Sequence, residues 1–158
     1  MTAYSFYLES PIYKLDSKNT YKAINQLQLF TNLYPKSERV EQCNNLIDEL
    51  REKLAKKAFF NAKQYVITEY HKSAIIALQN VLIDFPGSKY EEEIYFLIVE
   101  SSFQLGKNSI STKKQERLEN TIDAFYEFTE RYPESQFLKQ AKNIEKKTLK
   151  LIDTINQT

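Results

Sequence analysis

Apolar residues recur along the chain in steps of three and four, and one such pattern occurs three times. In each copy a small residue and an isoleucine are followed by apolar residues four and seven positions after the small one, then by an aromatic residue, a proline and a serine. The copies occupy residues 21–37, 71–88 and 118–135. Because these offsets place side chains on one face of a helix, each copy predicts an amphipathic helix.

Each of these helices should end at its proline, which is Pro35, Pro86 or Pro133. Proline cannot donate a backbone hydrogen bond and restricts the residue before it, and we expect that preceding aromatic residue to fill the gap at the helix end. The serine two positions after each proline is a good N-cap for the next helix. Glu91 follows Ser88 by three residues, which predicts a capping box.

Further apolar stripes lie between the copies and predict partner helices over residues 38–68, 89–106 and 136–156. The first of them is one helix of about eight turns. The acidic run at residues 91–93 falls in the first turn of the second partner helix. Carboxylates favour this positive end of the helix dipole, so we prefer a structural role for the run to an acidic binding site.

The alternation of helix, turn, helix and proline predicts an all-α fold: an α-α superhelix of divergent repeats with about seven helices. One helix pair cannot bury its own apolar stripe, so neighbouring pairs must stack. The polar segments 10–19 and 106–113 are expected to be loops. We expect one helical-repeat domain over residues 1–158. It comprises a partial repeat at 1–35, repeats at 36–86 and 87–133, and a C-terminal capping helix at 134–158.

Composition and charge argue against several classes of protein. The chain carries 22 Lys and Arg against 21 Asp and Glu, without the basic excess that a nucleic-acid partner requires. No apolar run approaches the roughly 18–20 residues of a membrane span. The two glycines, Gly87 and Gly106, are too few and too far apart for a glycine-rich phosphate loop.

The residues that could take part in catalysis or bind a metal stand alone in the sequence and do not form a site. His71 stands at a predicted turn, where a surface or helix-start histidine is expected rather than a catalyst. Cys43 falls on an apolar stripe between Val40 and Ile47 and should pack as a small hydrophobe. One histidine and one cysteine do not supply the three or four ligands that zinc needs. We therefore expect no metal, no cofactor and no enzymatic activity. A hydrolase or transferase with its site in a helical bundle would need polar residues clustered at the opening of that site, and the sequence shows no such cluster.

The long central helix carries the candidate protein interface. Its basic residues are interleaved with Glu49 and Glu52, a pattern that a solvated helix face with pairing along the helix would also show. The adjacent Phe59 and Phe60 cannot both point into one core, so one of them should reach a neighbouring helix or the surface. Exposed aromatic and arginine side chains are typical of interface hot spots. The candidate interface residues are Arg51, Lys53, Lys57, Phe60 and Tyr65.

The repeated pattern resembles the tetratricopeptide repeat, whose second helix has a small residue, apolar residues four and seven later, and a terminal proline. In front of Ala74, Ala62 and Tyr65 suit the small and aromatic positions of the repeat's first helix. Ala58 and Asn61 stand where that helix usually has Trp and Leu. The prolines are 51 (86 − 35) and 47 (133 − 86) residues apart, more than the usual period of about 34. The repeats are therefore divergent.

Over residues 3–150 the chain also resembles the BamD-like family of outer-membrane β-barrel assembly lipoproteins in its Bacteroidetes-type form. The resemblance rests on the order and spacing of four segments, at residues 10–43, 46–65, 73–90 and 123–135. It implies a non-catalytic scaffold on the periplasmic face of the outer membrane. The implied partners are the other subunits of the assembly complex. C-terminal repeats of the family dock on the periplasmic domains of the core barrel subunit, and N-terminal repeats recognise unfolded outer-membrane proteins.

The N-terminal segment MTAYSFYLES has no charged start, apolar stretch or cleavage site, so it does not read as a signal peptide. We expect the chain to be truncated here, with the lipid anchor and first repeat in a preceding part, and to be monomeric when isolated. The alternative is a generic tetratricopeptide-repeat scaffold or co-chaperone in the cytoplasm. A signal peptide ending in a lipid-acceptor cysteine upstream in the gene would distinguish the two.

Overall fold

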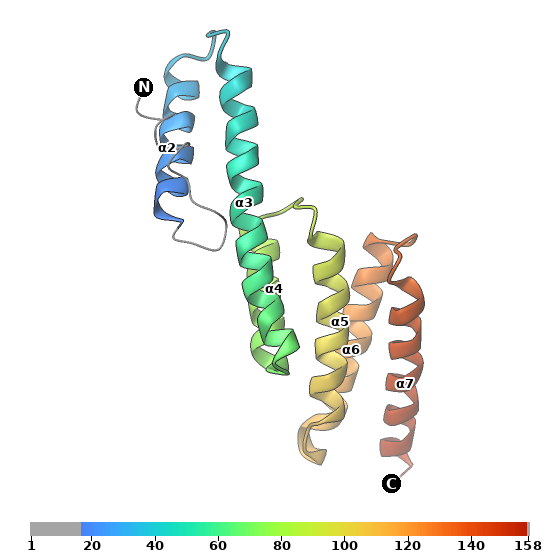
Figure 1. Ribbon diagram of the computed structural model, residues 1–158. Helices are drawn as coiled ribbons and strands as arrows, with labels where there is room; N and C mark the ends of the chain where they lie inside the picture. Colours follow the sequence, from blue (N-terminus) through green and yellow to red (C-terminus); the bar gives the residue numbers. More distant parts are fainter. Residues whose placement is uncertain (1–16, 158) are drawn as a thin grey trace. The chain divides into compact units, whose positions relative to one another are not determined.

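The computed structural model describes residues 17–157, and these form six α-helices without a strand (Figure 1). The all-α class is confirmed. The first part of the expected partial repeat and most of the loop predicted at 10–19 lie outside the described residues, and the end of that loop is wrong because α2 already begins at Lys18. The helices are α2 (Lys18–Leu33), α3 (Val40–Ile67), α4 (His71–Asp84), α5 (Glu91–Lys107), α6 (Ser111–Arg131) and α7 (Leu138–Asn156). No helix among them is long and apolar enough to cross a membrane.

The chain divides into two compact units, the first ending at Ala58 and the second beginning at Phe59. The first unit holds α2 and the N-terminal part of α3. The second unit holds the end of α3 together with α4, α5, α6 and α7. Each unit is described separately below.

The aromatic residue before each proline ends its helix in the same backbone conformation. Tyr34, Phe85 and Tyr132 have φ of −128°, −133° and −130° and ψ of 59°, 61° and 65°. Each N–H still donates to the carbonyl four residues earlier, at 2.9–3.0 Å. Proline disfavours the α conformation in the residue before it, so the helix stops there, as predicted. Phe85 and Tyr132 are half-buried, but Tyr34 is 58% exposed and does not fill a gap.

The same turn then leads into the next helix. The serine N–H donates back to the aromatic carbonyl at 3.0–3.3 Å, and the serine carbonyl accepts the N–H three residues later at 3.0–3.1 Å. In the second copy Gly87 has φ of 74°, a value that type II turns require at their third residue and that glycine adopts without strain. Lys36 and Glu134 occupy the equivalent positions with negative φ. Each following helix begins five residues after its proline.

The serines stabilise the turns but are not the N-caps predicted, because Tyr90 and Phe137 occupy the N-cap positions of α5 and α7 and neither helix has a side-chain cap hydrogen bond. Ser37 Oγ accepts the N–H of Arg39 at 3.3 Å, and Ser135 Oγ accepts the N–H of Phe137 at 3.0 Å. The capping box predicted after Ser88 is wrong, because the Ser88 hydroxyl is buried without a hydrogen-bond partner. The Glu91 carboxylate instead accepts the N–H of Gly87 at 2.9 Å.

In the first unit, α2 and the N-terminal part of α3 supply a small core and lie alongside each other in Figure 1. Its fully buried apolar residues are Ala23, Ile24, Leu27, Ile47, Leu50, Leu54 and Ala55. The Lys57 ammonium donates to Ser17 Oγ at 3.2 Å. Cys43, expected to be core filler, is only half-buried, because it lies a turn before the first fully buried residue of α3.

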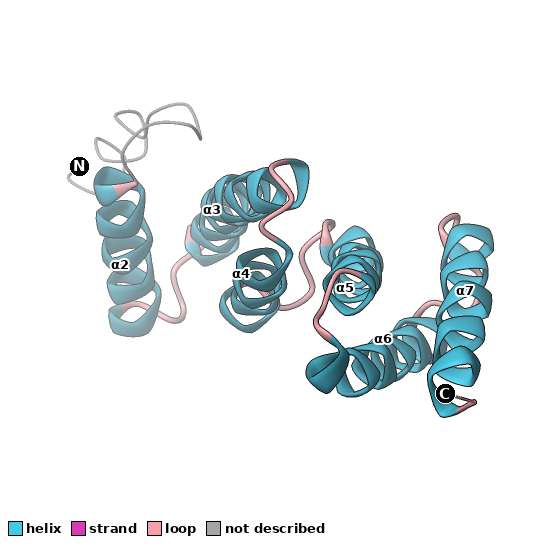
Figure 2. Ribbon diagram, turned by 90° about the horizontal axis from the view of Figure 1, so that it is seen from below, coloured by secondary structure: helices cyan, strands magenta, loops and turns pink. Residues whose placement is uncertain are grey.

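In the second unit, α5 is the central helix and packs against α4, α6 and α7 (Figure 2). Six consecutive residues, 94–99, are buried, and Ile94 and Val99 are fully inaccessible. A helix that is apolar on all sides needs neighbours on all sides. The apolar stripes of α4 and α6 supply them through Leu78 and Phe128, both 0% exposed.

The loop predicted at 106–113 is much shorter in the structure. α5 continues through Lys107 and α6 begins at Ser111, two turns before the predicted helix at 118. Ser109 Oγ holds the turn by donating to the Leu105 carbonyl and accepting from Arg117 Nη1 at 2.6 Å. Polar residues dominate here because the first turns of α6 are exposed to solvent. The absence of an apolar period was therefore a sign of an exposed helix and not of a loop.

We expect Gly106→Ala to lower the free energy of unfolding by about 1 kcal/mol. A Cβ at this position would lie 2.9 Å from Leu118 Cδ2 and 3.2 Å from the Arg117 carbonyl carbon. The overpacking cost of about 1–3 kcal/mol outweighs the gain of about 1 kcal/mol in helix propensity. Urea denaturation followed by circular dichroism measures the change. The loss should shrink in a Leu118→Val background, whereas a more stable Gly106→Ala variant would contradict the close contact.

Candidate protein-binding surfaces

The predicted interface residues are divided between the two units. In the first unit Arg51 is exposed, whereas Lys53 and Lys57 are half-buried. The bond from Lys57 to Ser17 Oγ already uses one of its N–H groups. Arg51 therefore presents the more accessible charge, and the two lysines offer part of their stems and ammonium groups.

In the second unit Phe59 and Phe60 take different roles, as their adjacency predicted. Phe59 is 1% exposed and stacks on Tyr90, with ring centroids 4.7 Å apart and an interplanar angle of 14°. Phe60 is 37% exposed and meets both rings edge-on, at 5.4 Å from Phe59 and 6.3 Å from Tyr90. Phe60 is thus an exposed aromatic side chain whose position is held by two neighbours.

Tyr65 lies further along α3 and is 45% exposed. Its carbonyl accepts the N–H of Tyr70 in the turn that leads to α4. His71 is the first residue of α4, the helix-start position that the sequence predicted. Its ring is half-buried, with Nδ1 lacking a hydrogen-bond partner in the described part of the chain.

Each carboxylate of the acidic run has a partner within the protein. Beside the bond from Gly87 to Glu91, the Ser135 hydroxyl donates to Glu92 Oε1 at 2.6 Å. Lys63 Nζ and Glu93 Oε1 form an ion pair at 2.6 Å. These contacts tie the start of α5 to α3 and to the turn before α7, which supports a structural role for the run.

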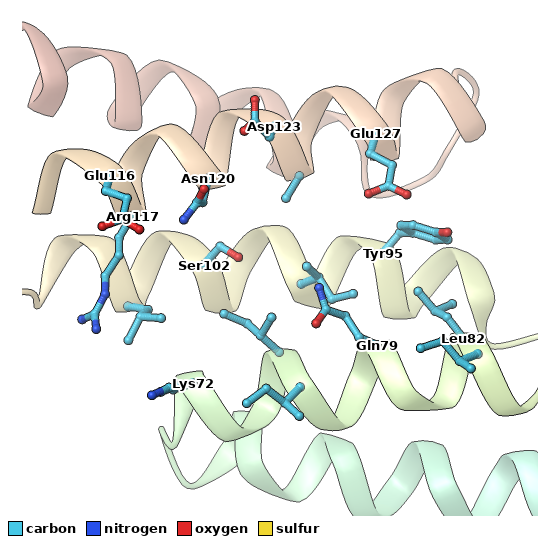
Figure 3. A pocket seen from close by; sticks show the side chains of 16 residues that line it. Lys72, Gln79, Leu82, Tyr95, Ser102, Glu116, Arg117, Asn120, Asp123 and Glu127 are labelled. Carbon is cyan, nitrogen blue, oxygen red and sulfur yellow. The ribbon is translucent and has the colours of Figure 1, made fainter. Parts of the chain in front are cut away.

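A groove that the sequence analysis did not predict lies in the second unit, over α5 and between α4 and α6 (Figure 3). Its volume is about 760 Å3, within the range of about 300–1,000 Å3 that is typical of ligand-binding clefts. Residues of α5 form its floor, among them Tyr95, Ile98 and Ser102. We refer to this feature as the groove.

The two walls of the groove differ in chemistry. The α4 wall is mainly apolar, and two of its isoleucines are unusually open to solvent: Ile76 is 52% and Ile83 75% exposed. The α6 wall is mainly polar and carries three carboxylates. These are Glu116, Asp123 and Glu127, and all three residues are exposed.

The two ends of the groove also differ. Lys72, Arg117 and Glu116 lie at one end, with one net positive charge, and Glu127 lies near Tyr95 at the other (Figure 3). Arg117 is held in place by its bond to Ser109 Oγ. Glu127 forms an exposed ion pair with Arg131 at 3.5 Å, which contributes little because water screens it.

Tyr95 connects the groove to the core. The Arg131 guanidinium lies over its ring, 5.0 Å from the centroid, and the Tyr132 ring lies 5.9 Å away. Burial raises the pKa of the Tyr95 phenol; Glu127 and Glu91 raise it further, and Arg131 opposes them. Burial raises the pKa of Tyr132 as well. Both phenols are therefore harder to ionise than a free tyrosine, the reverse of what activation as a general base requires.

Within residues 17–157, no three His, Cys, Asp or Glu residues come together in a way that could hold a metal ion. The sequence did carry one signal for the groove: Ile76 and Ile83 are seven residues apart and off the buried stripe of Ala74, Leu78 and Val81. Apolar residues on a second face of a helix indicate another surface to cover.

Comparison with known families gives one match. A family model described as YfiO, outer membrane lipoprotein, matches residues 1–118 and, in a second alignment, residues 68–151. The two alignments share residues 68–118, and a chain of repeated units can align in more than one register. No curated protein matches the chain significantly.

Phe59→Ala and Phe60→Ala should differ sharply in stability. Truncating the buried Phe59 should lower the free energy of unfolding by about 3–5 kcal/mol, because it leaves a cavity against Tyr90. Truncating Phe60 should cost about 1 kcal/mol, the loss of two edge-on ring contacts at a partly exposed site. Urea denaturation of both variants checks the difference. Equal losses would show that Phe60 is a core residue and not part of a surface.

The raised pKa values of Tyr95 and Tyr132 predict a delayed ionisation at high pH. A phenol whose pKa is higher in the folded state stabilises the fold fully below the unfolded pKa of about 10 and loses that contribution as pH rises through the folded value. The Tyr95→Phe/Tyr132→Phe variant should lack the part of the tyrosinate absorbance that appears at a pH above the ordinary phenol pKa. Its stability should also fall less steeply above pH 10. An unchanged alkaline titration curve would contradict the assignment.

Proposed function

Because the chain belongs to the YfiO family of outer membrane lipoproteins, we propose that it is a non-catalytic scaffold subunit of the machinery that assembles β-barrel proteins in the outer membrane. In this role it docks on the periplasmic domains of the core barrel subunit. Its site of action is the periplasmic face of the outer membrane. The isolated chain is a monomer, and its partners are the other subunits of the complex.

The observation that carries the docking role is the state of Phe60. An aromatic side chain that is 37% exposed yet held by two other rings loses little rotational freedom when a partner covers it. Preorganised aromatic side chains of this kind dominate the binding energy of many protein interfaces. Phe60 can therefore contribute area without the entropic cost of a mobile side chain.

The basic residues of the first unit provide a second, separate contribution. Arg51 is exposed, and its planar guanidinium can bind a carboxylate through two parallel hydrogen bonds. Lys53 and Lys57 lie on the same helix and add positive charge. Charges at the rim of an interface act mainly on the rate and orientation of association. These basic residues would be complementary to an acidic surface on the partner.

We expect Phe60→Ala to weaken binding to the purified periplasmic domains of the core barrel subunit by about 10-fold or more, as loss of a hot-spot aromatic does. Lys53→Glu should weaken binding several-fold, with a smaller effect at high salt. Surface plasmon resonance at two salt concentrations, with circular dichroism as a check of folding, measures both.

Matched controls are available in the second unit. Tyr126 is 58% exposed and leans edge-on against the buried Phe125 at 5.5 Å and 63°, the arrangement that Phe60 has with Phe59. Tyr126→Ala and Lys142→Glu should leave the affinity unchanged. Wild-type affinity in folded Phe60→Ala and Lys53→Glu would remove these residues from the interface. No binding by the folded wild-type chain would exclude the docking role and favour a generic repeat scaffold.

A further inference from the structure

We propose that the groove of the second unit binds an amphipathic helix of a partner protein, with an apolar edge toward α4 and a basic edge toward α6. This binding is separate from docking through Phe60, and either can hold without the other. The groove lies wholly within the second unit, so the proposal depends only on contacts among α4, α5 and α6.

The apolar wall requires an apolar occupant. Ile76 and Ile83 are more than half exposed although both line a cleft. They are seven residues apart on α4, which corresponds to about 10.5 Å along the helix. Gln79 lies between them and can donate and accept hydrogen bonds at the rim. A partner with apolar side chains at the same spacing would remove both isoleucines from water, which favours binding.

The polar wall selects the charge of the occupant. Glu116 and Asp123 are also seven residues apart, so their separation along α6 is again about 10.5 Å. Neither takes part in an ion pair with the described residues. Lys or Arg side chains on the occupant would neutralise carboxylates that now face solvent, so charge complementarity favours a basic edge.

The equal spacing on both walls favours a helical occupant. In a helix, residues seven apart return to the same side after about two turns. A guest helix lying along the groove can therefore present apolar anchors to Ile76 and Ile83 and basic residues to Glu116 and Asp123. Grooves that bind helices recognise anchor side chains that are spaced one or two helical turns apart on the bound helix.

The size of the groove agrees with this occupant. A helix as long as the stretch from Lys72 to Ile83 would be about 16.5 Å long and, as a cylinder about 10 Å wide, would fill about 1,300 Å3. The groove holds about 760 Å3, a little more than half of that volume. The remaining part of the helix would stay in solvent. The guest would therefore contact the groove through its apolar and basic edges and expose a polar face.

The charged ends of the groove set the direction of the guest. The C-terminal end of a helix carries partial negative charge and its N-terminal end partial positive charge. At one end of the groove the positive charges of Lys72 and Arg117 outnumber the carboxylate of Glu116, which favours the C-terminus of the guest, and Glu127 at the other end favours its N-terminus (Figure 3). The guest should therefore run antiparallel to both α4 and α6.

The test uses the full chain and fluorescent synthetic peptides whose binding is followed by anisotropy. The probe is a four-turn helical peptide with leucines along one edge and arginines along the adjacent edge. The comparison peptides are a shuffled version of the same composition, a version with glutamates in place of the arginines, and an extended peptide that alternates leucine and arginine. The helical basic peptide should bind at least 10-fold more tightly than each of the others.

Variants of the groove locate the binding site. Ile83→Ser and Asp123→Lys change exposed side chains and should each weaken the helical basic peptide about 5- to 10-fold while circular dichroism stays unchanged. Asp123→Lys should also improve binding of the glutamate version. The controls Leu149→Ser, at a 44% exposed position, and Glu130→Lys, at an exposed one, lie outside the groove and should have no effect.

Equal affinity of the shuffled peptide, or wild-type affinity in both groove variants, would overturn the proposal. Tighter binding of the alternating extended peptide would also overturn it, because the groove would then recognise a strand and not a helix. These experiments leave Phe60 and the basic residues of the first unit intact. A failure here therefore does not bear on docking to the core barrel subunit, and a failure of docking does not bear on the groove.

Discussion

The fold depends on one steric constraint, the clash between a proline ring and the helical conformation of the residue before it. It acts at Tyr34, Phe85 and Tyr132, which adopt nearly the same dihedral angles. Since the same backbone hydrogen bonds follow each time, the next helix always begins five residues after the proline. A constant offset presents the same face of each following helix, so one local rule can organise a whole series of helix pairs.

The groove results from the central position of α5 among its neighbouring helices. α5 is buried on most sides because α4, α6 and α7 all pack on it, and its first-turn carboxylates bind Gly87, Ser135 and Lys63. Placing α5 between α4 and α6 separates those two helices, and the space over α5 remains open. The exposed isoleucines of α4 and the carboxylates of α6 then line that space. A structural role for the acidic run and a binding role for the groove are thus consistent.

The sequence predicts the helices well because their ends depend on local steric rules and their buried faces on local periodicity. Ala23, Ala74 and Thr121 were placed on the helix faces from spacing alone, and all three are 0% exposed. Errors arose where a side chain reaches across a turn, a contact that apolar periodicity does not report. The turn before α6 depends on Arg117 reaching Ser109, and the α5 start depends on Glu91 reaching Gly87 rather than Ser88. The two isoleucines on a second face of α4 indicated a further surface, but the groove itself could not be predicted, because its walls come from helices whose relative placement is fixed only through α5.

The second unit combines neutral tyrosines at its centre with two exposed surfaces of different chemistry. Burial raises the pKa of both Tyr95 and Tyr132, so the two phenols stay neutral at ordinary pH. What the unit exposes instead is two surfaces of different character: an aromatic side chain braced by two rings at Phe60, and an apolar wall facing a carboxylate wall in the groove. A partner with a pocket for Phe60 would not fit the groove. A basic amphipathic helix that fits the groove would not fit Phe60. In the two proposed interactions, unlike surfaces of one set of helices would discriminate between two different partners.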